Sequence, residues 1–320
     1  MDLVAGILEG NRRALAKGIT LVENGEPEKY RILAELHPHT GKSMIVGVTG
    51  SPGAGKSSLV DQMTKFYRKQ GRTVGVIAID PTSPFSGGAL LGDRIRMQDN
   101  TLDPGVFIRS MGTRGSLGGL SRATKEVLTL FDAFGFDVII VETVGVGQSE
   151  LDIMDTADTV VVVLTPAGGD IIQTLKAGIM EIADVFAVNK SDLDGADRVV
   201  SEVNKTLDLS HGEWRPPVVK TITLDGTGLD ELLAEIDKHR EYLISSGNLE
   251  ILRQKRLKEE VTGIVLHKLE DMITLRFQQD RQVQGLLESV VNREQDPYTA
   301  AQSIMFSLES WLPESAAESS

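Results

Sequence analysis

"VTGSPGAGKSSLV", residues 48–60, matches the pattern GxxxxGK[ST] through Gly50, Gly55, Lys56 and Ser57. An apolar run precedes the pattern and a helical run follows it, which is the context in which this pattern binds phosphates. Glycines let successive backbone N–H groups point inward at phosphate oxygens, and the start of the helix adds a favourable dipole. The stretch therefore predicts a strand, a phosphate-binding loop and a helix.

The loop also supplies the first set of candidate nucleotide contacts. Lys56 is predicted to bridge the β- and γ-phosphates, and the Ser57 hydroxyl is predicted to ligate Mg²⁺. The full set of predicted contacts in this loop is Gly50, Ser51, Pro52, Gly53, Ala54, Gly55, Lys56, Ser57 and Ser58.

A magnesium ion also needs carboxylate oxygens near the loop, because Mg²⁺ keeps several waters and takes few protein ligands. Asp80 and Glu142 lie at the ends of predicted strands, and Asp93 follows in the stretch after Asp80. Parallel sheets bind ligands outside the carboxyl ends of their strands, so Asp80 and Glu142 are well placed. Asp93 requires that its loop fold inward. These three are the candidate metal ligands.

The segment "ETVGVGQSE", residues 142–150, places Gly145 and Gly147 beside the expected γ-phosphate, together with Gln148 and Glu150. This composition is typical of a switch segment that the γ-phosphate orders and that its loss releases. Either Gln148 or Glu142 is a candidate for orienting the attacking water, and the sequence does not choose between them.

The surrounding sequence predicts an α/β fold. From residue 44 to about residue 223, short β-branched runs alternate with helical stretches. The run "VVVVL", residues 160–164, lacks polar alternation, as expected when helices cover both faces of a sheet. We predict a doubly wound, mainly parallel sheet of seven strands at residues 44–49, 73–80, 106–111, 137–143, 159–166, 184–190 and 217–224.

Three regions follow from this reading. Residues 1–43 are predicted to be an N-terminal helical segment, residues 44–246 the nucleotide-binding domain, and residues 247–320 a C-terminal helical arm. The arm begins with a helix over residues 249–279 that carries an apolar stripe among charges, continues to residue 291, and ends in a helix from Pro297 to about Trp311. Periodicity alone allows the arm either to fold back on the sheet or to pair with a second copy.

The identity of the base is indicated by "FAVNKSDLDG", residues 186–195, which contains the NKxD pattern after a predicted strand. Guanine presents two neighbouring donors that one carboxylate accepts together, whereas adenine has no such pair, so Asp192 selects GTP. Asn189 is predicted to brace the loop or contact the base edge, and the Lys190 stem to cover the ring. A Ser-Ala turn usually completes such a pocket, but here backbone N–H groups would have to serve, because the turn reads Ile222, Thr223 and Leu224.

Composition excludes other classes of function. The chain of 320 residues has a formal net charge of −13, which argues against nucleic-acid binding, since a phosphate backbone requires clustered Lys and Arg. It has no cysteine and therefore neither a disulfide framework nor a thiolate metal site. No segment reads as a secretory leader or a membrane span, so we expect a cytoplasmic protein.

Long segments of the sequence resemble the MeaB/ArgK-type GTPases, the methylmalonyl-CoA mutase accessory proteins among the P-loop GTPases that act as metal and cofactor chaperones. The resemblance covers nearly the whole chain. It is carried by "GSPGAGKSS", "DPTSPFSGGALLGDRIRM", "RSMGTRGSLGGLS", "DVIIVETVGVGQSE", "LTPAGGDIIQTLKAGIMEIAD" and "NKSD".

The resemblance implies a slow GTPase that uses GTP, GDP and Mg²⁺, binds the adenosylcobalamin-dependent methylmalonyl-CoA mutase, gates cofactor loading and protects or reactivates that enzyme. It implies that Asp80, Asp93 and Glu142 match the acidic positions around Mg²⁺. The stretch at residues 168–181 matches a mobile loop that communicates with the mutase, with Lys176 as its nucleotide-state contact. The C-terminal helices match a homodimerisation arm, which favours pairing.

Two other functions stay open. One is a P-loop kinase for an amino-acid transport component, as the ArgK label suggests, although Asp192 argues against an ATP-dependent form. The other is a metal-insertion GTPase, a class that commonly carries His-rich or Cys-bearing motifs. Here five histidines are scattered, with only His37 and His39 near each other. Arg109 and Arg114 follow a strand and either reach phosphates or a partner, or are plain surface residues.

Overall fold

The computed structural model describes residues 2–80, 100, 102–112, 122–143, 152–166, 180–209 and 212–306, with only the backbone of Asp80 and Asp152. The chain divides into two compact units, Met1–Leu252 and Arg253–Ser320. In the part of the chain that the structure describes, no helix has the length and apolar character needed to cross a membrane.

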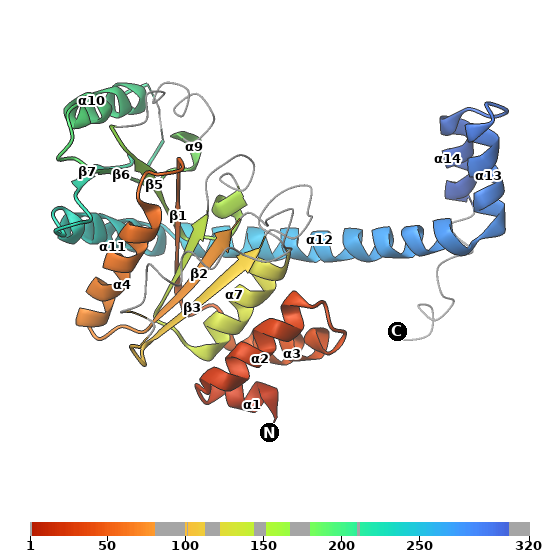
Figure 1. Ribbon diagram of the computed structural model, residues 1–320, viewed down its shortest axis with the longest axis horizontal. Helices are drawn as coiled ribbons and strands as arrows, with labels where there is room; N and C mark the ends of the chain where they lie inside the picture. The colour runs from red at the N-terminus through yellow and green to blue at the C-terminus, as the bar shows by residue number, and fades with distance from the viewer. Residues whose placement is uncertain are drawn as a thin grey trace. The chain divides into compact units, whose positions relative to one another are not determined.

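The first unit is built on one seven-stranded sheet whose strands follow the order β3-β2-β4-β1-β5-β6-β7 and are all parallel (Figure 1). The predicted α/β fold with a seven-stranded sheet is thus confirmed. The strands are β1 Met44–Gly50, β2 Val74–Asp80, β3 Val106–Gly112, β4 Val138–Thr143, β5 Thr159–Leu164, β6 Val185–Asn189 and β7 Val218–Thr221.

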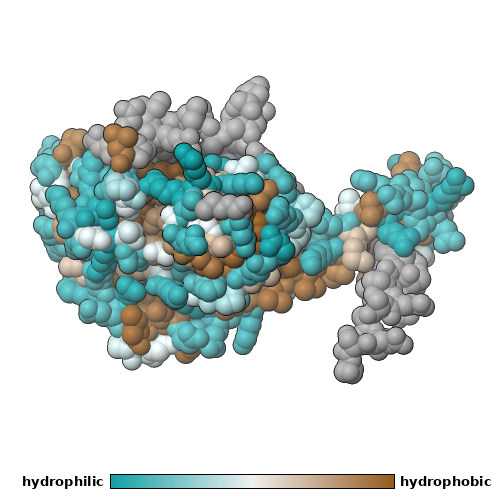
Figure 2. Space-filling model, turned by 90° about the horizontal axis from the view of Figure 1, so that it is seen from below, coloured by the Kyte–Doolittle hydropathy of each residue, from teal (hydrophilic) through white to brown (hydrophobic). Residues whose placement is uncertain are grey.

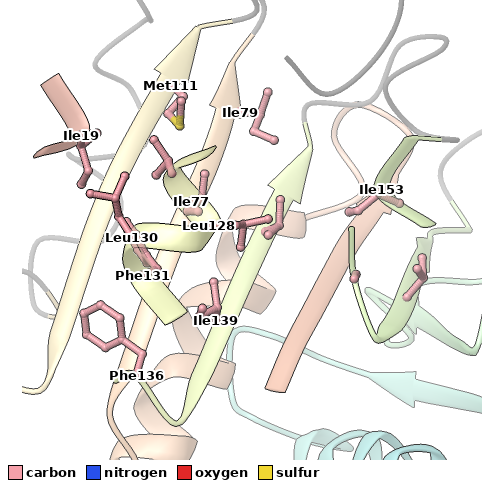
Figure 3. Packing of buried hydrophobic residues seen from close by; sticks show 14 of the residues in the cluster. Ile19, Ile77, Ile79, Met111, Leu128, Leu130, Phe131, Phe136, Ile139 and Ile153 are labelled. Carbon is pink, nitrogen blue, oxygen red and sulfur yellow. The ribbon is translucent and has the colours of Figure 1, made fainter. Parts of the chain in front are cut away.

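Helices cover both faces of this sheet. Helices α4 (Lys56–Lys69) and α11 (Leu229–Ser245) pack on one face, while α7 (Arg122–Phe134) and α10 (Ala196–Leu207) pack on the other. In β4, Ile140 belongs to the first layer and Ile139 to the second, because successive side chains of a strand point to opposite faces. Figure 3 shows the second layer, where Ile77 and Ile139 of the sheet meet Leu128 and Phe131 of α7.

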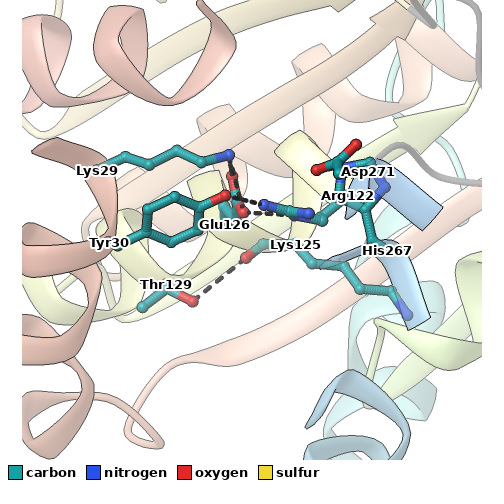
Figure 4. A network of polar contacts seen from close by, with 8 residues as sticks. All are labelled: Lys29, Tyr30, Arg122, Lys125, Glu126, Thr129, His267 and Asp271. Atoms are coloured by element: carbon teal, nitrogen blue, oxygen red, sulfur yellow. Dashed lines mark hydrogen bonds and ion pairs between the residues drawn. The ribbon is translucent and has the colours of Figure 1, made fainter. Parts of the chain in front are cut away.

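The N-terminal segment is helical, as α1 (Leu3–Leu8), α2 (Arg12–Glu23), α3 (Glu28–Leu36) and the short η1 (His37–His39). It is joined to α7 by a buried ion pair of 2.7 Å between Lys29 Nζ and Glu126 Oε2. Arg122 donates to Glu126 over 2.8 Å and to the Tyr30 hydroxyl over 2.9 Å (Figure 4). Because breaking a buried pair leaves an uncompensated charge, this network fixes the helical segment to the sheet domain.

Two shorter elements complete the description of the first unit. The 3₁₀ helix η3 (Asp152–Asp155) precedes β5, and the single turn α9 (Met180–Ile182) precedes β6. Strand β7 ends at Thr221 instead of at residue 224, because Ile222 pairs antiparallel with Thr227 and turns the chain back.

The second unit consists of the long helix α12 (Asn248–Gln279), whose first residues belong to the first unit, followed by α13 (Arg281–Val291) and α14 (Pro297–Phe306). Asp280 caps α13 by accepting from the Gln282 N–H over 2.9 Å. Val283, Ala300 and Ile304 are buried in this small hairpin, whereas none of the 32 residues of α12 is buried. The predicted end of the last helix near Trp311 lies outside the described residues.

Candidate nucleotide site

The predicted phosphate loop lies between the carboxyl end of β1 and the start of α4. Two glycines set its shape. Gly50 has a φ of 137°, and a Cβ there would lie 2.2 Å from the Val163 carbonyl oxygen of β5. Gly55 has a φ of 93°, and its Cβ would lie 2.3 Å from Asn189 Nδ2. Only glycine meets both the backbone geometry and the close approach, so the loop is held tightly against two other strands.

Lys56 and Ser57 lie at the first turn of α4, facing the loop and the sheet. The buried Lys56 ammonium donates to the Gly50 carbonyl over 2.6 Å and to the Ser51 carbonyl over 3.1 Å. Ser57 Oγ donates to Glu142 Oε1 over 2.6 Å. The structure therefore brings together three residues that the sequence predicts for one site. In the loop itself Ala54 is buried, while Pro52, Gly53 and Ser58 are exposed.

Glu142 is the best-placed acidic side chain in the described part of the chain. It is 2 % exposed near the end of β4 and lies in register with Val48 of β1 and Ala78 of β2. Asp80 ends β2 at the same edge of the sheet, but its side chain is not described. Asp93 lies outside the described residues.

The oxygens at this point fit a hard cation. A Ser57 hydroxyl and a Glu142 carboxylate lie 2.6 Å apart, and Mg²⁺ prefers oxygen ligands and fills its other positions with water and phosphate oxygens. The described residues hold no group of three or more His, Cys, Asp or Glu that could bind a metal without such outside ligands.

Asn189, at the end of β6, joins the phosphate loop to the predicted base-binding segments. Its Nδ2 donates to the Ala54 carbonyl over 2.8 Å, and its Oδ1 accepts from the Thr221 hydroxyl and the Thr223 N–H, each over 3.4 Å. The side chain is fully buried. Of the two roles that the sequence allows, this geometry is that of a brace.

The residues after Asn189 continue toward solvent. Lys190 adopts a φ of 56°, which is unusual for a residue other than glycine, and its ammonium donates to the Gly53 carbonyl over 2.9 Å. Asp192 is exposed in the following turn. The bond from Lys190 to Gly53 thus links this turn to the phosphate loop, and the exposed Asp192 follows Lys190 by two residues.

The turn that replaces Ser-Ala is ordered by its own backbone. The Ile222 N–H donates to the Thr227 carbonyl over 2.9 Å, so it is already engaged within the turn. Thr223 is buried with its N–H directed at Asn189, whereas the Leu224 side chain is 92 % exposed. Gly228 closes the turn with a φ of 76°, where a Cβ would lie 1.9 Å from the Lys220 carbonyl oxygen.

Several predicted residues fall outside the part of the chain that the structure describes. They are Asp93, Arg114, Gly145, Gly147, Gln148, Glu150 and Lys176. The choice between Gln148 and Glu142 for orienting water therefore stays open. Arg109 is described, and it forms an ion pair with Glu23 of α2. His37 and His39 are both exposed.

One pair of residues at this edge, Thr49 and Thr143, was not identified from the sequence. Thr143 Oγ1 donates to Thr49 Oγ1 over 2.9 Å, and both side chains are fully buried. Thr49 directly precedes Gly50, and Thr143 directly follows Glu142. The two threonines are 94 residues apart, so their pairing could be predicted only from the register of β1 against β4.

Comparison with known proteins identifies a family and several relatives of this chain. The family model described as methylmalonyl-CoA mutase-associated GTPase MeaB matches residues 15–278. A homologue from Pyrococcus abyssi is 52 % identical over 313 residues, covering 95 % of each chain. The mouse protein named methylmalonic aciduria type A homolog, mitochondrial, is 39 % identical over 277 residues, covering 80 % of this chain and 66 % of the mouse protein.

A solved structure is similar over almost the same length. The crystal structure described as LAO/AO transport system kinase has a TM-score of 0.72 and 27 % sequence identity, covering 96 % of this chain and 97 % of that one. The family match covers most of the chain and includes the phosphate loop, Glu142 and the NKxD residues. This chain belongs to the MeaB family of methylmalonyl-CoA mutase-associated GTPases and is itself a GTPase.

Proposed function

We propose that GTP binds at the carboxyl edge of the sheet, with its phosphates in the loop at residues 50–58 and its base against Asp192. Lys56 already donates two hydrogen bonds to loop carbonyls, so its ammonium is positioned to transfer them to phosphate oxygens. Asp192 accepts the two guanine donors, and the Lys190 stem covers the ring. The turn at Ile222, Thr223 and Leu224 would line the remaining side of the base, with Leu224 as its exposed side chain.

Ser57 and Glu142 would hold the magnesium ion, with Asp80 and Asp93 as further candidate ligands. When bound, the ion neutralises charge on the β- and γ-phosphates. The chain's own contribution is placement: β4 and α4 present a carboxylate and a hydroxyl from two directions, and Lys56 supplies a fixed positive charge. Catalysis of this kind depends on positioning and electrostatics more than on covalent chemistry.

We further propose that the protein is a chaperone for an adenosylcobalamin-dependent methylmalonyl-CoA mutase, acting in the cytoplasm to gate cofactor loading and to protect or reactivate the enzyme. The observation that carries this proposal is the match to the mutase-associated family model over residues 15–278. The name of the mouse relative, which refers to methylmalonic aciduria, supports it. Gly145, Gly147 and Lys176 are the proposed switch residues that would report the nucleotide state to the mutase.

The test is to mix the purified protein with such a mutase and to compare GTP turnover with and without it. We expect a nucleotide-dependent complex and faster hydrolysis in its presence, because a partner can complete the alignment of the attacking water. Lys56→Ala serves as the control for turnover by contaminants. No complex in any nucleotide state would contradict the chaperone role while leaving the GTPase assignment intact.

A kinase for an amino-acid transport component is the second candidate, and the description of the similar crystal structure favours it. Transfer of labelled γ-phosphate from GTP to a protein or small-molecule acceptor, instead of to water, would support it. A metal-insertion GTPase is the third candidate. It would be supported by stoichiometric binding of a transition-metal ion to the nucleotide-free protein.

We also propose that the C-terminal arm, residues 247–320, forms a homodimer with a second copy. Exposed apolar side chains run along α12, among them Ile251, Val261, Val265, Leu266 and Leu275, and hydrophobic surface is visible there in Figure 2. Tyr298, Met305 and Phe306 extend the exposed apolar surface on α14. A small helical hairpin cannot bury enough surface to be stable by itself, so a second copy is the occupant we propose.

The dimer is tested by analytical ultracentrifugation of the full chain. Val261→Lys places a charge on the apolar stripe and should shift the protein to monomer at micromolar concentration. Thr262→Lys adds the same charge at the neighbouring exposed position and should leave the dimer intact. A wild-type chain that sediments as a monomer would contradict the proposal.

A further inference from the structure

We infer that the buried hydroxyl pair Thr49–Thr143 is a positioning element that holds the Glu142 carboxylate at the metal side of the phosphate loop. This inference rests on the proposed nucleotide site. It assigns a role to two residues that belong to none of the nucleotide motifs.

The first step is the placement of the pair. Glu142 lies in register with Val48, whose side chain packs in the layer of α4 and α11. Successive side chains of a strand point to opposite faces, so Glu142 faces α4 while Thr143 faces the other layer. At the end of β4, Glu142 is therefore tied to α4 through Ser57, and Thr143 is tied to β1 through Thr49.

These contacts close a ring around the loop. Lys56 bonds the Gly50 carbonyl, Ser57 bonds Glu142, and Thr143 bonds Thr49, which directly precedes Gly50. Peptide bonds complete the ring, because Lys56–Ser57, Glu142–Thr143 and Thr49–Gly50 are consecutive residues. Four residues of the ring are at most 6 % exposed: Lys56, Glu142, Thr49 and Thr143. Ser57 is half-buried.

The second step is what metal binding does to this ring. If Ser57 and Glu142 hold a cation, both would use oxygen lone pairs for it, and only the Ser57 proton would remain to link the two side chains, which now lie 2.6 Å apart. The Thr143–Thr49 bond lies on the opposite face of the sheet and is compatible with loading. It is a side-chain bond that keeps the end of β4 against β1 and uses neither of the oxygens that the ion would need.

The measurement is the affinity of GDP for the full chain, by displacement of a fluorescent guanine nucleotide, in excess Mg²⁺ and in EDTA. GDP is used so that the readout does not depend on hydrolysis. Thr143→Val keeps the shape of the side chain and removes the donor. We expect it to weaken binding in Mg²⁺ by roughly three- to tenfold, the usual effect of one lost hydrogen bond, and to leave binding in EDTA unchanged.

The companion variants separate positioning from packing. Thr49→Val should give the same loss as Thr143→Val, and the double variant no further loss, because both remove one bond. Thr143→Ser restores the hydroxyl and should recover most of the affinity in Mg²⁺. The matched control is Thr159→Val, which removes a buried hydroxyl contact of the same 2.9 Å length at the other end of the sheet and should change neither affinity.

Two results would overturn this inference and leave the proposed nucleotide site standing. One is that the threonine variants bind GDP in Mg²⁺ as tightly as the wild type does. The other is an equal loss of GDP affinity in Mg²⁺ and in EDTA, which would indicate only a role in stability. If Thr143→Val does not fold, Thr49→Val and Thr143→Ser decide the question. Nucleotide binding that is independent of Mg²⁺ in the wild type, or that survives Lys56→Ala unchanged, would instead overturn the proposed site, and the inference with it.

Discussion

The two ends of the same sheet both carry buried polar clusters, yet they differ in what they can do. At the amino end, His239 of α11 has its Nδ1 2.9 Å from the Thr159 hydroxyl and its Nε2 3.3 Å from Asp184 Oδ1. The indole of Trp214 packs on His239 with ring centroids 4.8 Å apart and donates to the Asp184 carbonyl over 2.9 Å. At the carboxyl end lie Glu142 and its partners.

The amino-end cluster has the order hydroxyl, imidazole, carboxylate that nucleophilic enzymes use, but it is closed. Thr159 is fully buried and His239 is 3 % exposed. Burial lowers the pKa of His239 to about 4, although the nearby Asp158 carboxylate acts in the opposite direction. The ring is therefore neutral near pH 7, with its two nitrogens satisfied by Thr159 and Asp184, and the cluster stabilises the packing of α11 on the sheet.

At the carboxyl end, strand direction gathers loops and the start of α4. Lys56 and Glu142 are buried there, while Pro52 and Gly53 of the loop and Asp192 are exposed. The comparison teaches that buried hydrogen-bonded side chains do not by themselves mark an active site. Among the described residues, the two ends differ in that only the carboxyl end combines buried charged side chains with a glycine-shaped loop at a helix start.

The largest expected effect tests the carboxyl end. Lys56→Ala should abolish GTP turnover, with a loss of at least about a hundredfold, because one fixed positive charge at the phosphates is removed. Phosphate release is the measurement. Lys69→Ala, an exposed lysine at the end of the same helix, is the control and should hydrolyse GTP at the wild-type rate. If Lys56→Ala still hydrolysed GTP at the wild-type rate, the phosphates would not bind at the loop that contains Lys56, and the carboxyl end of the sheet would lose its assigned role.

The next effect concerns the base. Asp192→Asn should weaken GTP binding by about 1 to 3 kcal/mol, because an amide cannot accept both guanine donors. Isothermal titration with GTP measures this, and Asp194→Asn, also exposed in the same turn, should bind as the wild type does. Equal affinities for the wild type and Asp192→Asn would contradict the assignment of the base pocket to this edge.

The closed end should respond to pH. The unfolded His239 binds a proton below about pH 6.5, whereas the folded side chain resists protonation until about pH 4, so stability is lost as the pH falls through this window. Between pH 7 and pH 5 the loss should be about 2 kcal/mol, measured by urea unfolding. His239→Leu should remove this part of the pH dependence. An unchanged slope in that variant would show that the ring is not the titrating group.

The smallest expected effect is one on stability alone, at the amino end of the sheet. Thr159→Val removes the hydroxyl contact to His239 and should lower the free energy of unfolding by about 1 kcal/mol, while GTP turnover stays unchanged. Denaturant unfolding and phosphate release on the same preparation give both values. A drop in turnover without a drop in stability would show that the amino end communicates with the nucleotide site.

The motifs predicted where their residues lie in the fold because each motif is local. Lys56 and Ser57 stand next to their glycines, and Asn189 and Asp192 stand at the end of one apolar run, so spacing along the chain was enough to place them after β1 and β6. The prediction of β7 ran three residues too far, since the apolar alternation of Ile222 and Leu224 continues into a turn that the backbone bond from Ile222 to Thr227 closes.

Local pattern in the amino-acid order was sufficient to predict the fold class, a phosphate loop between β1 and α4, and guanine as the base, since each prediction depends on residues a few positions apart. The pairing of Thr49 with Thr143, the brace from Asn189 to Ala54 and the closed state of His239 depend on which strands become neighbours. Those contacts join residues 80 or more positions apart, and no spacing rule predicts them. They exist because the register of a parallel sheet brings distant strand ends to one edge.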